Sequence, residues 1–235
     1  MSNITQTKHG LMAIEYPQDY ISQRLLETGE YEWYVIEIIK SLCSSHDQGL
    51  FLDIGANQGT VTLPIARDLT GYTVHSFEVQ PVMISCLQRN VELNNLKNVV
   101  IHPHGLGEVE NTVTIPQPDY TQADNIGAFS LNPLVWKNST ISQGHGQPAQ
   151  VKVVPLDTIE FDQPIRCIKL DVEGFEKMVL QGAYRTLRKH NFPPIVYELW
   201  SYNSWWAGQA QEIETMLVQM GYQIKKIDDT GIAYQ

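Results

Sequence analysis

The sequence is poor in cysteine and in long apolar runs, and each shortage excludes a class of protein. Its three cysteines, Cys43, Cys86 and Cys167, lie far apart in apolar surroundings, which favours buried free thiols over disulfides or a metal cluster. No stretch approaches the roughly 20 consecutive apolar residues of a membrane span. The N-terminal residues MSNITQTKHG lack the pattern of a signal or transit peptide, so we expect a cytoplasmic protein without a membrane partner.

Positive charge is also scarce, because 16 Lys and Arg residues stand against 26 Asp and Glu residues, for a formal net charge of −10 at pH 7. Binding to nucleic acid depends on Lys and Arg side chains that neutralise phosphates, so we expect no nucleic acid as substrate or partner. No linker or shift in composition divides the chain. We therefore expect one domain over residues 49–235, preceded by an N-terminal extension and a packing helix over residues 1–48.

Apolar segments that suit buried strands alternate along the chain with segments of helical period. The expected strands are 49–54, 72–78, 98–104, 164–172, 193–200, 222–227 and 231–235. The expected helices are 31–45, 58–69, 81–94, 174–190 and 208–220, and Pro64 should kink the second of these. This alternation predicts a doubly wound α/β fold with a mostly parallel sheet, whose ligand lies beyond the C-terminal ends of the strands.

Residues 105–163 interrupt the alternation between the third and fourth expected strands. Short apolar stretches with turn residues between them fill this passage, and a passage of this length in a compact domain usually carries its own small sheet or a function. We expect a β insertion here, with a mobile tip near residues 142–148.

A glycine-containing turn, FLDIGANQG over residues 51–59, follows the first expected strand. Asp53 comes just before Gly55, and glycine adopts backbone angles that other residues avoid and lets a ligand approach the main chain closely. Glu78 ends the second expected strand, where an acid is placed to bind both hydroxyls of a ribose. The spacing predicts a site for a molecule that contains adenosine.

Three more acids, Asp171, Glu173 and Glu198, end the fourth and fifth expected strands, so five carboxylates gather along one edge of the sheet. An edge this acidic would repel a pyrophosphate. It suits a nucleoside that carries positive charge, since Coulomb attraction to carboxylates strengthens as water is excluded. S-adenosylmethionine (SAM) has both a sulfonium and an ammonium group, which makes it the favoured ligand.

Five sequence blocks resemble, in order, the FkbM family of SAM-dependent methyltransferases. They are FLDIGANQGTVTL, FEVQPVMISCLQRNVELNNLKNV, PLDTI, IKLDVEGFEKMVLQGA and IVYELW, over roughly residues 28–200. The resemblance implies a class I methyltransferase fold, which is Rossmann-like, with a seven-stranded sheet whose last strand is antiparallel. It also implies a typical activity, the O-methylation of a hydroxyl on a sugar, a glycan or a small natural-product scaffold.

The resemblance implies roles for the residues around the first turn. The family's first SAM-binding motif is matched by Asp53, Gly55, Asn57 and Gly59. Its ribose-binding acid is matched by Glu78. We therefore expect these five residues to bind the cofactor.

Other positions are assigned in the same way. The resemblance places Gly105 and Leu106 in the loop that flanks the adenine. Asp171 and Glu173 match the block beside the methionine end and the acceptor, so Asp171 is expected to serve both cofactor binding and catalysis, and Glu173 catalysis. Glu32 resembles an acid that the family often carries before its first strand, near the same end of SAM.

Methyl transfer is an in-line displacement, so alignment of the acceptor oxygen can supply most of the catalysis and a general base is optional. Candidate bases are Asp171, Glu173, His104 and His145, of which the two acids are favoured by position. We expect no metal. His102 and His104 alternate along a strand but lack an evident third ligand, and a Mg²⁺ site among the acids is the less favoured alternative.

Two further questions stay open at this point. The aromatic residues of WSYNSWWAG (200–208) either hold a sugar ring or an apolar substrate, or cover the core beneath the last helix. The alternatives to a methyltransferase are a SAM-binding scaffold without catalysis and, less favoured, a nicotinamide-dependent oxidoreductase. Against the oxidoreductase, this sequence lacks the third glycine of the usual dinucleotide-binding motif, and the pyrophosphate of the cofactor would face the acidic edge. The sequence does not indicate the acceptor molecule or the oligomeric state.

Overall fold

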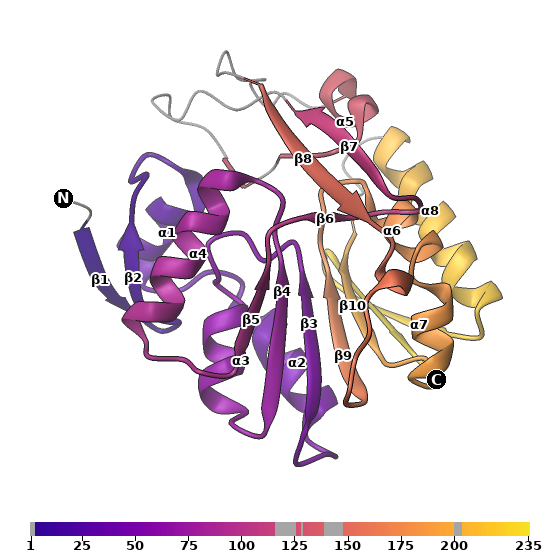
Figure 1. Cartoon of the computed structure of the whole chain (residues 1–235), viewed down its shortest axis with the longest axis horizontal. Helices are drawn as coiled ribbons and strands as arrows, with labels where there is room; N and C mark the ends of the chain where they lie inside the picture. The colour runs from indigo at the N-terminus through magenta and orange to yellow at the C-terminus, as the bar shows by residue number, and fades with distance from the viewer. Residues whose placement is uncertain (1–2, 116–125, 128, 139–147, 200–203) are drawn as a thin grey trace.

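The computed structural model describes residues 3–115, 126–127, 129–138, 148–199 and 204–235 (Figure 1). Its centre is a seven-stranded sheet with the strand order β11-β12-β10-β9-β3-β4-β5. In chain order these strands are β3 (Gly49–Ile54), β4 (Tyr72–Phe77), β5 (Val99–His102), β9 (Ile165–Leu170), β10 (Ile195–Glu198), β11 (Gln223–Ile227) and β12 (Thr230–Tyr234).

All seven expected strands are present, and the expected topology is confirmed. The pairs β3–β4, β3–β9, β4–β5 and β9–β10 are parallel. The last strand, β12, pairs antiparallel with both β10 and β11, so it runs against the other six. The carboxyl ends of the central strands therefore meet at one edge, which is where a ligand is expected.

Helices cover both faces of this sheet, which explains why its strands are apolar on both sides. In β3, Leu50 and Leu52 pack into a core with α6 (Glu176–Gln181), α7 (Tyr184–Lys189) and α8 (Ser204–Gln219). Phe51, between them in sequence, points to the other face and packs with α2 (Trp33–Cys43) and α3 (Thr62–Asp68). None of the described helices has the length and apolar character needed to cross a bilayer. All three cysteines are buried and free, as expected.

Two helices differ from the sequence expectation. The segment 174–190 forms two helices, α6 and α7, with Gly182 and Ala183 between them. The backbone carbonyl of Gly107 lies so close to Gly182 that a Cβ at this position would overlap it. The helix expected at 58–69 begins only at Thr62, since the preceding residues form the turn after β3. Pro64 thus lies in the first turn, where a missing N–H does not break the helix, so its expected place in the helix interior is wrong.

The N-terminal extension contains more than the expected packing helix, which is α2. A hairpin of β1 (Asn3–Thr7) and β2 (Gly10–Ile14) precedes α1 (Tyr20–Thr28), and the sequence reasoning missed both. Figure 1 shows the hairpin beside α4 (Pro81–Leu93). Asn90 of α4 and Asn94, the residue just after this helix, take the place of a neighbouring strand for β2.

Asn90 is completely buried, and its amide oxygen accepts the N–H of Ala13 at 2.8 Å while its amide nitrogen donates to the carbonyl of Gln58 at 2.9 Å. The side chain of Asn94 bonds both the N–H and the carbonyl of Leu11, at 2.9 and 2.7 Å. The hairpin is therefore fixed to α4 and, through Asn90, to the turn after β3.

The expected β insertion is confirmed. It is a three-stranded sheet of β6 (Gly105–Leu106), β7 (Asn111–Ile115) and β8 (Ala149–Val154), in the order β6-β8-β7, accompanied by α5 (Pro133–Asn138) and the short 3₁₀ helix η1 (Leu156–Thr158). Figure 1 shows this sheet beyond the carboxyl ends of the central strands. The mobile tip expected near 142–148 falls, apart from Pro148, outside the described residues.

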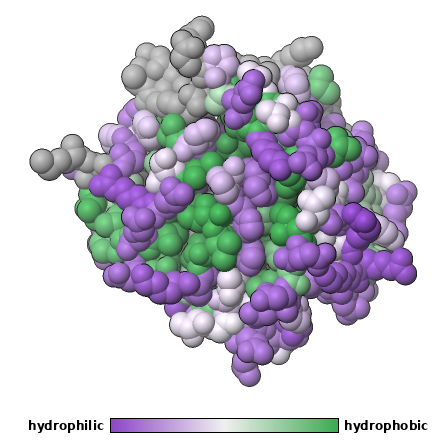
Figure 2. Space-filling view, viewed as in Figure 1, coloured by the Kyte–Doolittle hydropathy of each residue, from purple (hydrophilic) through white to green (hydrophobic). Residues whose placement is uncertain are grey.

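The surface gives no sign of one extended apolar face among the described residues. The exposed large apolar side chains, such as those of Val100, Val109 and Val218, come from different elements. Figure 2 shows one face of the molecule, on which polar side chains break up the apolar areas. Scattered exposure of this kind is ordinary for a folded domain.

We expect Asn90→Ala to lower the free energy of unfolding by roughly 2–4 kcal/mol, because two buried backbone groups lose their partners at once. Urea unfolding of the variant and the unchanged chain measures this difference. Glu92→Ala, on the exposed side of the same helix, is the control and should change stability by less than about 0.5 kcal/mol. Equal stability of the two variants would contradict this account of Asn90.

Candidate functional site

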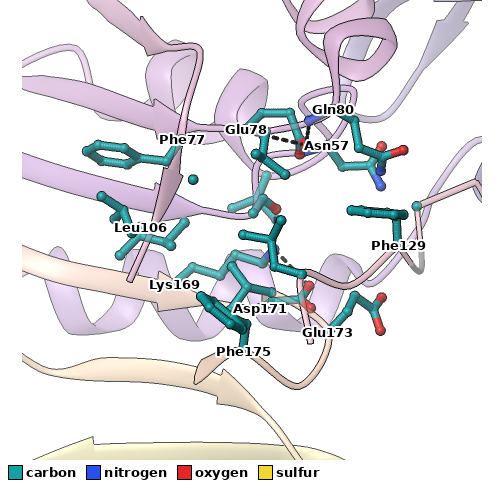
Figure 3. Close-up of a pocket in the computed structure, with 18 of the residues that line it drawn as sticks. Asn57, Phe77, Glu78, Gln80, Leu106, Phe129, Lys169, Asp171, Glu173 and Phe175 are labelled. Carbon is teal, nitrogen blue, oxygen red and sulfur yellow. Dashed lines mark hydrogen bonds and ion pairs between the residues drawn. The ribbon is translucent and has the colours of Figure 1, made fainter. Parts of the chain in front are cut away.

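A pocket of about 850 Å³, including its open mouth, lies at the carboxyl ends of β3, β4 and β9. It is lined by Gly55 and Asn57 after β3, Glu78 after β4, and Asp171 and Glu173 after β9. Figure 3 shows Glu78 on one side of this pocket and Asp171 and Glu173 on the other. The structure thus brings together the acids that the sequence placed at separate strand ends.

The turn after β3 depends on two residues with left-handed backbone angles. Gly55 has φ +84°, and a Cβ there would overlap the carbonyl oxygen of Asp171. The N–H groups of Gly55 and Ala56 both donate to the carbonyl of Phe77 at the end of β4. Asn57 follows with φ +50°, a conformation that asparagine tolerates better than most residues. The turn is therefore fixed to both neighbouring strands, with the N–H of Asn57 directed at Glu78.

Glu78 is held by three backbone N–H groups. Its Oε2 accepts from Asn57 at 2.8 Å, and its Oε1 accepts from Val79 at 2.7 Å and from Gln80 at 2.8 Å. Burial raises the pKa of Glu78, and these three hydrogen bonds oppose that rise by favouring the carboxylate. A carboxylate has about four acceptor positions, so Glu78 keeps capacity for a ligand hydroxyl in a fixed orientation.

Lys169, which the sequence reasoning missed, lies buried among the acids. Its Nζ donates to the carbonyl of Gly55 at 2.9 Å and lies 2.8 Å from Asp171 Oδ2 and 3.9 Å from Asp53 Oδ1. Burial alone would lower the pKa of Lys169, but Asp171 and Asp53 outweigh it and raise that pKa above its ordinary value. A lysine two residues before Asp171, between the apolar Ile168 and Leu170, was the sequence signal for it.

Asp53 has a supporting position behind Lys169. It is completely buried, and its Oδ2 accepts the hydroxyl of Thr62 at 2.6 Å. It does not line the pocket, whereas Asn57 two residues beyond Gly55 does. Gly59, with φ +98°, lies against Leu87 of α4 and allows the chain to enter α3. Direct contact of Asp53 and Gly59 with a cofactor stays a prediction.

Three carboxylates form a cluster at the other side of the pocket. One oxygen each of Asp171, Glu173 and Glu198 lies within 4.8 Å of the other two. Burial raises the pKa of Glu173 and of Glu198 well above the ordinary range, and the neighbouring Asp171 adds to both. The cluster has the chemistry to bind a cation. The Lys169 ammonium 2.8 Å from Asp171 offsets part of this negative charge. The choice between an organic cation and Mg²⁺ stays a prediction.

Glu32 approaches the same cluster from the start of α2. It has left-handed angles, with φ +46° and ψ +37°, and lines the pocket together with Tyr31, whose hydroxyl bonds its carboxylate. Burial raises the pKa of Glu32, and Asp171 across the pocket adds to the effect. The position agrees with the expected neighbourhood of the methionine end, and cofactor binding by Glu32 stays a prediction.

The opposite end of the pocket is apolar and aromatic. Gly105 and Leu106 of β6 line it with Phe77, as does His104. A Cβ at Gly105 would come within 3.0 Å of Leu131 and 3.3 Å of Val79, so the glycine keeps the wall narrow. This apolar slot has the chemistry to hold an adenine ring, and contact of Gly105 and Leu106 with a cofactor stays a prediction.

The histidines beside this end pair with each other. His75 Nδ1 and His102 Nε2 are hydrogen bonded at 2.9 Å, and His102 stacks on Phe77. Burial lowers the pKa of His102 to about 4 and also lowers that of His104. Among the described residues, no group of three metal-ligating side chains includes His102 or His104, and a structural role for both stays a prediction. His145, the other candidate base, lies outside the described residues.

Gln80 is a second residue that the sequence reasoning missed. It is buried and lines the pocket, and its amide nitrogen donates to the carbonyl of Ile126 at 3.2 Å. Its amide oxygen Oε1 is buried without a hydrogen-bond partner. An unsatisfied buried acceptor costs free energy, so this atom fits a ligand that offers an N–H or O–H group.

The loop after β9 is shaped by Glu176. Its Oε1 accepts the N–H groups of Val172 at 3.0 Å and Gly174 at 3.2 Å, and burial raises its pKa to about 7. Trp206 is buried with its ring against Gly174, so this member of the aromatic stretch 200–208 covers the loop. Trp200 and Tyr202 lie outside the described residues, and their role stays a prediction.

Comparison with known proteins agrees with this geometry. Residues 53–224 match the family described as the methyltransferase FkbM domain. "Methyltransferase 1" of Beauveria bassiana (strain ARSEF 2860) is 28% identical over 148 residues, which cover 58% of this chain and 59% of that protein. The matched part is thus less than two thirds of the length of that relative.

Two solved structures show the same fold at low identity. A putative caffeoyl-CoA O-methyltransferase from Staphylococcus aureus has a TM-score of 0.52 and 17% identity, covering 85% of this chain and 82% of that one. The precorrin-6y C5,15-methyltransferase from Geobacter metallireducens GS-15 has a TM-score of 0.51 and 12% identity, with coverage of 86% and 88%. Both are methyltransferases by name, and the likeness confirms the expected fold class.

We expect Glu176→Gln to remove the contribution of this carboxyl to the pH dependence of the free energy of unfolding. The folded-state pKa near 7 lies above the 4.5 of an unperturbed glutamate, so the folded chain binds the proton more tightly. The free energy of unfolding of the unchanged chain should therefore fall between pH 4.5 and 7, by as much as roughly 3 kcal/mol. The glutamine oxygen still accepts both N–H groups without titrating.

Urea unfolding at pH 5 and pH 8 measures this effect. The drop in stability between the two pH values should be smaller in Glu176→Gln than in the unchanged chain. Glu37→Gln, at a position whose side chain is 57% exposed, is the control and should keep the full drop. The same drop in all three proteins would show that Glu176 titrates normally.

Proposed function

This chain belongs to the FkbM methyltransferase family, and from that premise we propose that it transfers the methyl group of SAM to a hydroxyl of a sugar, a glycan or a small natural-product scaffold. The observation that carries the proposal is one pocket with two ends. Glu78, fixed by three N–H groups, lies at the end with the apolar slot, and the carboxylate cluster lies at the other.

The pocket residues fit SAM at each of its parts. Glu78 has acceptor capacity for the ribose hydroxyls, and the buried Oε1 of Gln80 offers an acceptor to a polar hydrogen of the nucleoside. Asp171, Glu173 and Glu32 place negative charge where the ammonium and sulfonium groups are expected. When bound, SAM supplies an electrophilic methyl group on a good leaving group, and the chain has to hold the acceptor oxygen in line with it.

Glu173 is the better placed of the two acids to receive the acceptor proton. Asp171 is paired with Lys169 at 2.8 Å, so its charge is already partly neutralised. Glu173 has left-handed backbone angles, with φ +55°, that project it from the loop after β9 into the pocket. Burial raises the pKa of Glu173, so its carboxylate is a stronger base once it is ionised. General-base catalysis depends on the pKa of the base, which favours Glu173 for this role.

A second cavity, of about 490 Å³, adjoins the first and gives room for an acceptor. The two share Glu32, Lys169 and Asp171, and the second is also lined by Glu198 and Asp229. Among the described lining residues of both cavities Lys169 is the one Lys or Arg. We therefore propose a neutral or cationic acceptor, because a phosphate or carboxylate would be repelled by this wall.

Turnover with labelled SAM decides between this proposal and its alternatives. A panel of neutral, cationic and anionic hydroxyl compounds is offered to the purified chain, and transfer to a neutral or cationic member supports the proposal. A SAM-binding scaffold would bind SAM and label nothing. A nicotinamide-dependent oxidoreductase, which the family membership disfavours, would bind NADH and not SAM.

We expect Glu78→Ala to weaken SAM binding by roughly 1–3 kcal/mol, because ribose hydroxyls lose their acceptor. Titration calorimetry measures the change, and a thermal unfolding scan shows that the variant is folded. Glu27→Ala, at an exposed position in α1, is the control and should bind SAM like the unchanged chain. Unchanged affinity in folded Glu78→Ala would count against the assignment of this pocket to SAM.

Asp171→Asn should lower turnover more than SAM affinity if this residue faces the acceptor. The amide keeps the size of the carboxylate but loses its charge and its ion pair with Lys169. Separate measurements of kcat and of the dissociation constant of SAM, with Asp47→Asn at an exposed position as the control, check this. A loss of affinity with unchanged kcat would instead assign Asp171 to the cofactor alone.

A further inference from the structure

His9 connects the N-terminal hairpin to the wall of the cofactor pocket. It lies in the turn between β1 and β2 and is only 1% exposed. Its Nδ1 is 2.6 Å from the carbonyl oxygen of Thr60, and its Nε2 is 2.9 Å from the backbone nitrogen of Tyr31. Thr60 and Tyr31 both line the pocket. One imidazole therefore joins two pocket residues that come from different segments of the chain.

The carbonyl of Thr60 is available to His9 because of Pro64. In α3 the N–H of Leu63 donates to Gly59 and that of Ile65 donates to Val61. The bond between them in this series would run from residue 64 to the carbonyl of Thr60, and proline has no N–H to make it. The Nδ1–H of His9 fills the position that Pro64 leaves open, so an unsatisfied buried carbonyl is avoided.

The two partners of His9 fix its protonation state. A carbonyl oxygen only accepts, so Nδ1 must carry a hydrogen, and a backbone N–H only donates, so Nε2 must be bare. Neutral imidazole with the hydrogen on Nδ1 satisfies both partners. Protonated imidazole would direct a second N–H at the N–H of Tyr31 and lose that bond.

The surroundings of His9 also favour the neutral ring. Burial lowers its pKa, the bond to Thr60 and the charge of Glu30 oppose this, and Arg67 and Lys8 lower it further. The Lys8 ammonium is paired with Glu30 at 2.6 Å and lies over the ring of Trp33, and Trp33 meets His9 edge to face at 5.4 Å. Arg67 is held nearby by the carbonyl of Lys8.

We propose that His9 is a positioning residue of the cofactor site, which sets the place of the Tyr31–Glu32 corner relative to the turn after β3. The inference rests on the proposed binding of SAM to this pocket. Glu32 follows Tyr31 directly and begins α2 with left-handed angles, so a displaced Tyr31 amide displaces the Glu32 carboxylate. Neutral His9 therefore supports binding, and protonated His9 opposes it.

This arrangement predicts an acid-sensitive affinity for the cofactor. Binding should be constant from pH 7 to 8 and should weaken as the pH falls below the ordinary histidine value of 6.5, because protonation of His9 competes with the bound arrangement. Other groups in the pocket also titrate, among them His104 and Glu78. Variants of His9 separate its contribution from theirs.

Three substitutions separate the contributions of the two hydrogen bonds of His9, one to Thr60 and one to Tyr31. His9→Asn offers an amide N–H near the position of Nδ1 and nothing near Nε2, whereas His9→Gln offers an amide oxygen near Nε2. His9→Phe keeps the ring against Trp33 and loses both bonds. Titration calorimetry with S-adenosylhomocysteine, from pH 5.5 to 8, is expected to show affinity about fivefold weaker in the first two at pH 7.5 and weaker again in the third.

The pH profile distinguishes positioning from general stabilisation. All three variants should show a smaller loss of affinity on acidification than the unchanged chain, and His46→Asn, at an exposed position, should show the full loss. Equal affinity and equal pH profiles in the variants and the unchanged chain would overturn the inference. Failure of the unchanged chain to bind at pH 7.5 would instead overturn the proposed function.

A measurement on the unchanged chain avoids any variant that does not fold. Nuclear magnetic resonance of the histidine rings should find His9 with its hydrogen on Nδ1, and its titration should move to lower pH when S-adenosylhomocysteine binds. A hydrogen on Nε2, or the same titration in free and bound protein, would overturn the inference.

Discussion

The site depends on the hydrogen bond and the ion pair that the Lys169 ammonium makes. This ammonium joins the carbonyl of Gly55 after β3 to the carboxylate of Asp171 after β9, and it lies close to Asp53 beneath them. Without this charge the ends of two neighbouring strands would carry buried carboxylates with no compensation, which is a costly arrangement. With it, the turn after β3 and the loop after β9 are held in one orientation, and the pocket lies between them.

Lys169 compensates only part of the negative charge, and the remaining negative charge attracts a cationic ligand to the pocket. Asp171, Glu173 and Glu198 share a small volume. Burial raises the pKa of Glu173 and of Glu198, and the nearby Asp171 raises both further. A cationic ligand replaces protons on these carboxyls, and its binding is stronger where water is excluded. The same excess of negative charge is the basis for proposing a cationic cofactor and a neutral or cationic acceptor.

Local patterns in the sequence predicted the central sheet, the β insertion and the residues that strand ends present, such as Gly55 and Glu78. These features follow from alternation, glycine placement and the order of strands, which are read within a few residues. Lys169, Gln80 and His9 were missed because each depends on at least one distant partner, such as Gly55, Ile126 and Thr60, which lie 114, 46 and 51 residues away. The break between α6 and α7 was missed as well, and it lies where the distant backbone of Gly107 approaches Gly182.

The N-terminal hairpin and α1 illustrate how such distant contacts change the meaning of a domain boundary. A boundary between residues 48 and 49 agrees with where the central sheet begins, yet hydrogen bonds cross it at the site. His9 bonds Thr60, and Asp19 at the start of α1 accepts the N–H of Ile126, whose carbonyl in turn accepts from Gln80 in the pocket wall. The extension thus contacts the pocket on two sides. His9 bonds the Thr60 carbonyl that Pro64 leaves without a helical partner, and Asp19 bonds Ile126 in the segment after β7. A functional unit defined by these bonds includes the hairpin, α1 and the central sheet together.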